Sequence, residues 1–293
     1  METGNNHPQP LPPLAPTFHL TGSAFQPDQP EQYRLTLELD GYFLKYTALH
    51  VASRRFEKVG RIELNQAAPA PWADAWKQLS LPGEAFASTH LILHNKAYTL
   101  VPQGLFDAGG INDYLNYHYG EDPQAMSQFM PLPVMNAVGV FRADRNLHAW
   151  ALQHLPGGHI VHPMSILIES LLSLYKHEPK AQMFIHVRTG FIDVVVISNR
   201  ALLLANSFEC HSPEDHLYYV LFVMEQLALT PSETETALMG DILEGDALHL
   251  LMAQYLHHIR FEGRPLTIDY ADPYRDIPAH QFFILHQEYL CAS

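Results

Sequence analysis

The chain has 293 residues, of which 47% are hydrophobic and 16% charged, a balance that is typical of a folded globular protein. Acidic residues outnumber basic ones by 31 to 17, and the resulting charge of −14 argues against nucleic acid as a general partner. No apolar run is long enough for a membrane span, and the first residues do not resemble a secretory signal. Two cysteines make no disulfide framework, so we expect a cytoplasmic protein.

The first 30 residues contain seven prolines and little periodicity, which predicts an extended proline-rich arm, with disorder as the alternative. The folded body begins at Tyr33, where Leu35, Leu37 and Leu39 alternate with Thr36, Glu38 and Asp40 on the opposite face. Asp40-Gly41 then supplies the turn of a hairpin. The pattern predicts a buried leucine face and a solvent face that carries the acids.

The remaining elements fall into two series of strands and helices, which predict a first domain over residues 31–158 and a second over 159–293. In the first series we expect strands near 56–64, within 89–106 and at 134–141, and helices at 71–81, in the second half of 104–120 and at 147–155. In the second series we expect strands at 158–163, 183–209, 235–241 and 266–270, and helices at 164–177, 212–229, 244–259 and 279–290. Ser212 as N-cap and Pro213 in the first turn mark the start of one of these helices. The two series form an architectural pseudo-repeat.

Five segments occur in the order found in actin-like ATPases: LELDGYFLKYTAL, LILHNKAYTLVPQGLF, HIVHPMSILIESL, HVRTGFIDVVVISNRALLLANSF and TALMGDILEGDALHLLMAQYL. The chain resembles that superfamily, within it the actin-like proteins of type IV pilus assembly, and more closely a bacterial family defined as domain of unknown function 3822. The resemblance implies an α/β, actin-like ATPase (ribonuclease H-like) fold of two domains, each with a mixed sheet of the five-stranded type and flanking helices.

The resemblance also implies three turns that would surround a nucleotide between the domains. Glu38, Asp40 and Gly41 stand at the first phosphate hairpin, Arg188, Thr189 and Gly190 at the second, and Gly240 and Asp241 at the adenosine turn. Actin-like ATPases need acids at both hairpins because Mg²⁺ takes oxygen ligands. Here His186 or Arg188 falls where the second acid belongs, and Asp241 and Ile242 follow Gly240 where more glycine is usual.

These residues also have simpler interpretations. Arg188 can clamp a phosphate in place of the metal, or it can be a surface arginine at a hairpin tip, which we favour. Glu38 and Asp40 can be metal ligands or water-positioning acids, or merely residues on an exposed face and turn.

Other catalytic or metal sites find little support. His154, His159 and His162 lack the spacing of zinc ligands, so we expect no metal site. Cys210 and His211 are neighbours on a strand and face opposite ways, which argues against a cysteine nucleophile.

Two functions remain. We expect a non-catalytic interaction or scaffold protein that binds a protein partner, with degenerate phosphate hairpins, no catalytic residue and no cofactor. The alternative is a weak ATPase or kinase that binds ATP and Mg²⁺ in the interdomain cleft, with Glu38, Asp40 and Asp241 as the acids facing the metal.

Overall fold

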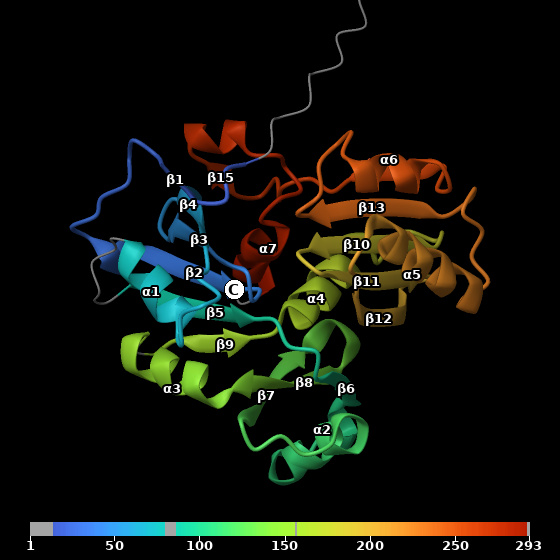
Figure 1. Cartoon of the computed structure of the whole chain (residues 1–293), viewed down its shortest axis with the longest axis horizontal. Helices are drawn as coiled ribbons and strands as arrows, with labels where there is room; N and C mark the ends of the chain where they lie inside the picture. The colour runs from blue at the N-terminus through green and yellow to red at the C-terminus, as the bar shows by residue number, and fades with distance from the viewer. Residues whose placement is uncertain (1–13, 80–85, 156, 292–293) are drawn as a thin grey trace, which may run out of the picture.

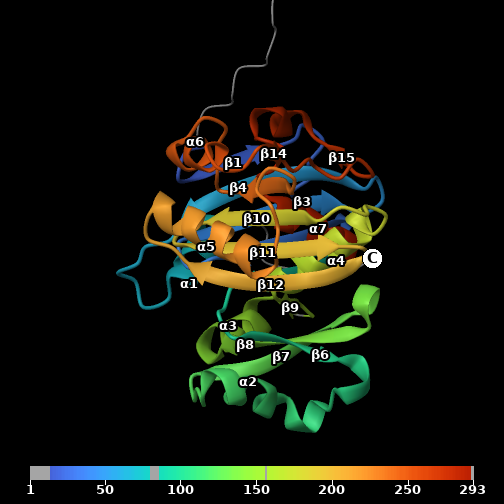
Figure 2. The same ribbon diagram turned by 90° about the vertical axis from the view of Figure 1, so that its right-hand side faces the viewer.

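The computed structural model describes residues 14–79, 86–155 and 157–291. Within these ranges the chain forms two large β-sheets that stand face to face with helices between them and on both outer sides (Figure 1). A smaller third sheet lies to one side of this stack (Figure 2). The predicted arm falls partly outside these ranges, since residues 1–13 are not described.

The first sheet has seven strands in the order β1-β4-β3-β2-β5-β9, with β15 also paired to β4. Its strands are β1 (Phe18–Thr21), β2 (Tyr33–Leu39), β3 (Phe43–His50), β4 (Arg55–Glu63), β5 (Ser88–Leu93), β9 (His159–Val161) and β15 (Asp269–Tyr270).

The second sheet has five strands in the order β12-β11-β10-β13-β14. They are β10 (Gln182–Arg188), β11 (Phe191–Ser198), β12 (Ala201–Glu209), β13 (Glu235–Gly240) and β14 (His258–Phe261). The order matches β4-β3-β2-β5-β9 of the first sheet: an antiparallel meander is followed by two strands that add in parallel beside its first strand. The two sheets therefore repeat one topology, as the pseudo-repeat predicts, but the repeat begins at β10 and not at the strand predicted over 158–163.

The third sheet, in the order β6-β8-β7, was not expected as a separate unit. It consists of β6 (Tyr98–Pro102), β7 (Ala125–Leu132) and β8 (Ala137–Asp144), and α2 (Ile111–Tyr119) packs on it through a small core around Leu115 and Val140. The strand β7 was missed because its burial follows no simple alternation.

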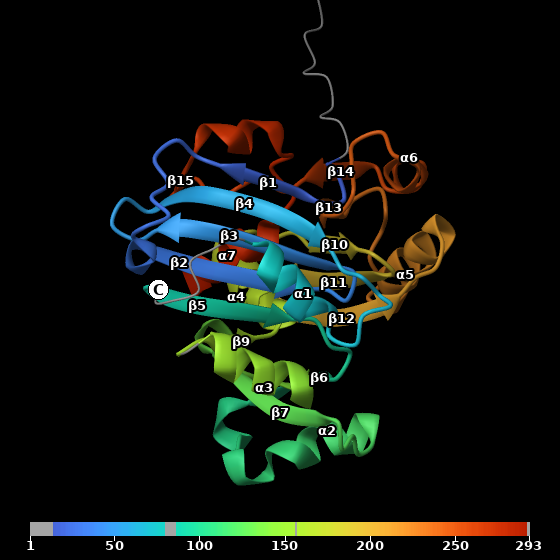
Figure 3. The ribbon, with the colours of Figure 1, turned by 60° about the vertical axis from the view of Figure 1, so that its left-hand side comes forward.

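The helices divide among the outer and inner layers. The outer face of the first sheet packs on α1 (Pro71–Gln78) and α3 (Arg145–His154), as Figure 3 shows, and the outer face of the second packs on α5 (Pro213–Gln226) and α6 (Ala247–Ala253). Between the sheets lie α4 (Pro163–Tyr175) and α7 (Phe283–Cys291). Short 3₁₀ turns complete the chain: η1 (Pro30–Gln32), η2 (Gln103–Leu105), η3 (Ala108–Gly110), η4 (Pro133–Met135) and η5 (Asp272–Asp276).

One hydrophobic core runs through the middle of the molecule. It contains Phe56 and Val59 of the first sheet, Leu167 of α4, Phe283 of α7 and Val195 of the second sheet, among other buried residues. Because α7 packs on β2 and β3 of the first sheet, α4 on β11 and β12 of the second, and the two helices on each other, loss of either helix would expose the inner face of a sheet to water.

Local sequence explains how α5 begins. The side chain of Ser212 accepts a hydrogen bond from Asp215 N, the side chain of Asp215 accepts one from Ser212 N, and Pro213 occupies the first turn. This capping box satisfies backbone donors that a helix start would otherwise leave without partners. The predicted N-cap is confirmed.

Three segments are placed differently from the sequence-based expectation. Phe18 to Thr21, within the expected arm, form the edge strand β1 against β4. His159 to Val161, expected to open the second domain, pair with β5 of the first sheet. The end of the chain returns to the first sheet through β15 and α7, where the side chains of Arg34 and Thr36 on β2 donate hydrogen bonds to Glu288 of α7.

The end of β13 allows a stability test with a matched control. Gly240 and Gly245 both have φ +85°, but a Cβ on Gly240 would lie 2.2 Å from Val187 O, whereas a Cβ on Gly245 would have no neighbour within 4 Å. We expect Gly245→Ala to lower the free energy of unfolding by about 1–2 kcal/mol from backbone strain. Gly240→Ala should cost a further ~1–3 kcal/mol or more from overpacking. Urea denaturation measures both, and equal losses would contradict the close packing at Gly240.

Candidate nucleotide cleft

The first hairpin turns its acids inward. Glu38 and Asp40 are 2% and 7% exposed, so the expectation that they lie on a solvent face is wrong. The face that carries Thr36 and Glu38 is buried because α7 packs against it near Thr36, while His94, which contacts Glu38, stacks on His186 of the second sheet. Asp40 Oδ1 accepts hydrogen bonds from Tyr42 N at 2.9 Å and Phe43 N at 2.7 Å. The Asp40 carboxylate thus accepts the hydrogen bonds of the backbone N–H groups in its own hairpin. Gly41 at the tip is exposed.

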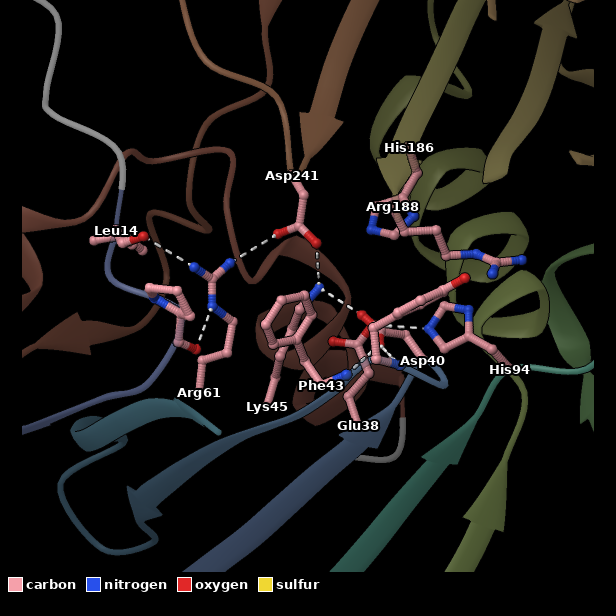
Figure 4. A network of polar contacts seen from close by, with 12 residues as sticks. Leu14, Glu38, Asp40, Phe43, Lys45, Arg61, His94, His186, Arg188 and Asp241 are labelled. Carbon is pink, nitrogen blue, oxygen red and sulfur yellow. Dashed lines mark hydrogen bonds and ion pairs between the residues drawn. The ribbon is translucent and has the colours of Figure 1, made fainter. Parts of the chain in front are cut away.

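Lys45 lies at the centre of the cluster (Figure 4). Its Nζ is 3.2 Å from Asp40 Oδ2 and 2.8 Å from Asp241 Oδ2, and its side chain is 5% exposed. Burial alone would lower the pKa of Lys45, but Asp241, Asp40 and Glu38 outweigh burial and raise it. The ammonium therefore stays charged and links the first hairpin to the turn that follows β13.

Glu38 has a partner on each side. It pairs in register with Lys45 of β3, and its Oε1 accepts a hydrogen bond from His94 Nε2 at 2.8 Å. Burial would raise the pKa of Glu38, but Lys45 and His94 lower it to about 2. Burial and Arg188 lower the pKa of His94, so its imidazole is neutral at pH 7.

The second hairpin buries its arginine. Arg188 is 5% exposed, its Nε is 3.2 Å from Asp193 Oδ2, and its guanidinium lies 4.2 Å from the ring centre of Phe191. His186 Nδ1 is 3.2 Å from the same carboxylate oxygen. The interpretation of Arg188 as a surface arginine is wrong. Thr189 is exposed at the tip, beside Gly190 with φ +76°.

The third turn completes the cluster. Gly240 N donates to His280 O at 3.1 Å, and Asp241 N donates to Val187 O at 2.7 Å. The carboxylate of Asp241 also lies 3.7 Å from Arg61, whose guanidinium donates to the carbonyls of Leu14 and Ala15 (Figure 4).

The structure thus brings Glu38, Asp40 and Asp241 together around Lys45, whereas Arg188 pairs with Asp193 instead. Sequence reasoning missed Lys45, Arg61 and His94. A signal existed for the first two, because the Asp40-Gly41 turn sets Lys45 opposite Glu38, and the next strand sets Arg61 opposite Lys45. No comparable local signal places His94 beside Glu38.

Other features of the described residues bear on the weaker hypotheses. No three or more His, Cys, Asp or Glu side chains are arranged there to hold a metal ion. Burial raises the pKa of Cys210 to about 11, which opposes thiolate chemistry at pH 7. No helix in those ranges has the length and apolar character needed to cross a bilayer.

Residues 22–259 match the model of a family described as "Protein of unknown function (DUF3822)". The chain belongs to this family. A comparison with the curated proteins finds no match.

Several solved structures share the fold of this DUF3822 protein, and two of them cover nearly the whole chain. A Bacteroides thetaiotaomicron protein with actin-like ATPase fold and unknown function has a TM-score of 0.76 at 18% identity, covering 92% of this chain and 99% of its own. A chain of the PilM–PilN type IV pilus biogenesis complex has a TM-score of 0.57 at 16% identity, covering 89% of this chain and 98% of its own. The predicted actin-like ATPase fold is confirmed, and so is the resemblance to the pilus proteins.

The buried lysine makes a first prediction for this site. Lys45→Met leaves Asp40 buried without its counter-charge, and breaking such a buried pair costs about 3–5 kcal/mol in the free energy of unfolding. Lys77→Met, which removes the exposed pair with Asp74, should change it by less than about 0.5 kcal/mol. Urea denaturation of both variants measures the difference, and a similar small loss in both would refute the role of Lys45.

The carboxylate of Glu38 makes a second prediction. Its pKa is lowered from 4.5 to about 2, so its contribution to stability is complete above pH 4.5 and is lost as the pH falls to about 2. The contribution amounts to about 3 kcal/mol. The stability difference between the wild type and Glu38→Gln should therefore shrink over that range in denaturation experiments. A difference that does not change with pH would contradict the lowered pKa.

Proposed function

We propose that this protein is a non-catalytic, protein-binding module of actin-like fold, whose interdomain cleft is held closed by its own charged side chains. The observation that carries the proposal is the position of the Lys45 ammonium between Asp40 and Asp241. In our proposal these two ion pairs join the two domains. In an actin-like ATPase the corresponding acids would face Mg²⁺ and its waters. Here they face a cation that belongs to the chain.

The residues around the cleft do not fit Mg²⁺-ATP. Phosphate binding at such turns needs free backbone N–H groups. The N–H groups of Tyr42 and Phe43 are engaged by Asp40, and those of Gly240 and Asp241 by carbonyls of the protein. The backbone of Gly240 also packs against Val187 and His186 so closely that it leaves no space for even a methyl group. These contacts support our proposal that the phosphate hairpins are degenerate.

The alternative, a weak ATPase or kinase, has one observation in its favour. Glu38, Asp40 and Asp241 converge, as metal-facing acids would have to do. However, a metal could reach them only if the ammonium of Lys45 left a buried position among three carboxylates. The cost of separating a buried ion pair favours the non-catalytic proposal.

A protein partner agrees with both the charge and the shape of the molecule. The net charge of −14 repels nucleic acid and favours basic or apolar protein surfaces. One structural neighbour is a chain of the PilM–PilN type IV pilus biogenesis complex, so a protein of this fold can be part of a protein assembly. A pocket of about 310 Å³ between the first and third sheets, with Phe129, Met130 and Ile160 in its wall, suits an apolar side chain of a partner. We place this interaction in the cytoplasm.

Calorimetry with Mg²⁺-ATP tests the proposal. We expect no saturable heat from the wild type up to several millimolar nucleotide and no phosphate release above a protein-free blank. Asp241→Asn is the matched variant, because it removes an acid of the cleft. Wild-type binding with one site per chain that is lost in Asp241→Asn would overturn the proposal and favour the enzyme.

A further inference from the structure

The outer side of the second domain carries a charge unlike that of the rest of the chain. Residues 201–259, which run from β12 through α5, β13 and α6 to the start of β14, contain nine Asp or Glu and no Lys or Arg. This fifth of the chain therefore accounts for −9 of the net charge of −14. Figure 2 looks onto this side of the molecule, where α5 and α6 lie. A surface with charges of one sign attracts partners of the opposite sign.

The solvent side of α5 brings acids and aromatic rings together. Successive steps of four, four and three residues lead along one side of the helix through Glu214, Tyr218, Phe222 and Glu225. All four side chains are exposed, Tyr218 by 62% and Phe222 by 40%. The two acids bracket the two rings and lie about 16 Å apart along the helix axis. We call these four residues the α5 stripe.

The rings of the α5 stripe are held in place by their neighbours. The ring planes of Tyr218 and Phe222 are 18° apart with centres at 6.2 Å, and Tyr218 also meets Tyr219 edge to face. Tyr219 in turn stacks on Phe208 of β12. A row of rings thus runs from the edge strand of the second sheet to the exposed side of α5. Because these side chains are already ordered, binding a partner to them costs less conformational entropy.

The α5 stripe has no cation of its own. Elsewhere in the molecule Arg61 lies over the ring of Phe43, with 4.6 Å to the ring centre. Within the part of the chain that the structure describes, no Lys or Arg lies over Tyr218 or Phe222 in this way. The two acids of the stripe form no ion pair with the described residues. The acids and the ring faces are therefore free to meet a cation from another molecule.

Helix stability explains only one of the two acids. Glu214 lies in the first turn of α5, where the helix dipole favours a negative charge. Glu225 lies in the last turn, where the dipole disfavours a negative charge, and no basic residue accompanies it there. Glu225 thus weakens the helix that carries it, as expected of a residue whose role lies in binding.

The outer helices of the first domain have a different surface. The exposed side of α1 carries the ion pair of Lys77 with Asp74, and α3 begins with the exposed Arg145. Among the large hydrophobic residues of Pro71–Gln78 and Arg145–His154, only Leu152 is exposed. The two sheets therefore have the same outer layer of helices, but the acids and exposed rings occur together on the second.

We propose that the α5 stripe is the docking surface for a basic segment of a partner protein, which carries Lys or Arg at two positions about 16 Å apart and apolar side chains between them. The cations pair with the two acids, and the apolar side chains pack on the two rings. This surface deepens the proposed protein-binding function, on which it rests, and it is separate from the pocket between the first and third sheets. A second copy of the chain does not fit, because two such acidic faces repel each other.

Fluorescence anisotropy with two labelled peptides tests the chemistry of the partner. Both are helix-forming peptides of about 16 Ala and Leu residues, with arginines near each end in one and glutamines at the same positions in the other. The arginine peptide should bind the full chain with a Kd below about 100 μM at low salt and about tenfold more weakly at about 0.5 M salt. The glutamine peptide should bind about tenfold more weakly than the arginine peptide at low salt. Equal binding of the two peptides, or no binding of the arginine peptide at about 1 mM protein, overturns the proposal.

Surface variants locate the binding site. The double variant Tyr218→Ser with Phe222→Ser removes both rings and should weaken binding of the arginine peptide about tenfold, whereas Leu152→Ser, a matched change on α3, should leave it unchanged. Glu225→Gln should weaken binding about threefold without lowering the midpoint of urea denaturation. Unchanged affinity in the double variant or in Glu225→Gln shows that the peptide binds elsewhere and overturns the proposal.

The peptide and nucleotide experiments separate the two proposals. A chain that binds both the arginine peptide and Mg²⁺-ATP contradicts the non-catalytic function and keeps the docking surface. A chain that binds neither contradicts the docking surface and keeps the non-catalytic function.

Discussion

The contact between the first sheet and the turn that follows β13 is centred on one buried cation. Lys45 extends from the first sheet into a group of carboxylates to which the second domain contributes Asp241. Two buried acids and the partly buried Asp241 would repel one another and be costly to desolvate if no positive charge lay among them. The neighbouring charged residues are paired around this cation. Arg61 forms an ion pair with Asp241, and His94 donates a hydrogen bond to Glu38. Arg188 forms an ion pair with Asp193.

The same region is a continuation of the central core. Because α7 packs on the first sheet, α4 on the second and the two helices on each other, the two sheets are joined by apolar side chains as well as by charges. Ion pairs set the orientation of such an interface, while apolar burial supplies most of its free energy. A protein built in this way has no need of a nucleotide to bring its domains together, which agrees with a module that presents fixed surfaces to a partner.

Much of the fold was predictable from sequence, because local patterns are strong where a strand or helix has one apolar side. The leucine face of β2, the capping box of α5 and the order of the two series are examples. The failures have a common cause, which is contact between residues far apart in the chain. Glu38 and Arg188 looked exposed because the contacts that bury them, such as those of Glu38 with His94 and of His94 with His186, are decided by tertiary packing. The Asp40-Gly41 turn is enough to predict that Lys45 lies opposite Glu38, but it does not predict that Asp241 lies beside Lys45.

A double-mutant cycle on Lys45 and Asp241 tests the central claim most directly. The free energy of unfolding is measured for the wild type, Lys45→Met, Asp241→Asn and the double variant. If the pair joins the domains, the double variant should lose less stability than the sum of the single losses, with a coupling energy of at least about 1.5 kcal/mol. Losses that add within about 0.5 kcal/mol would show that the two residues act independently and would contradict a cleft held closed by its own cation.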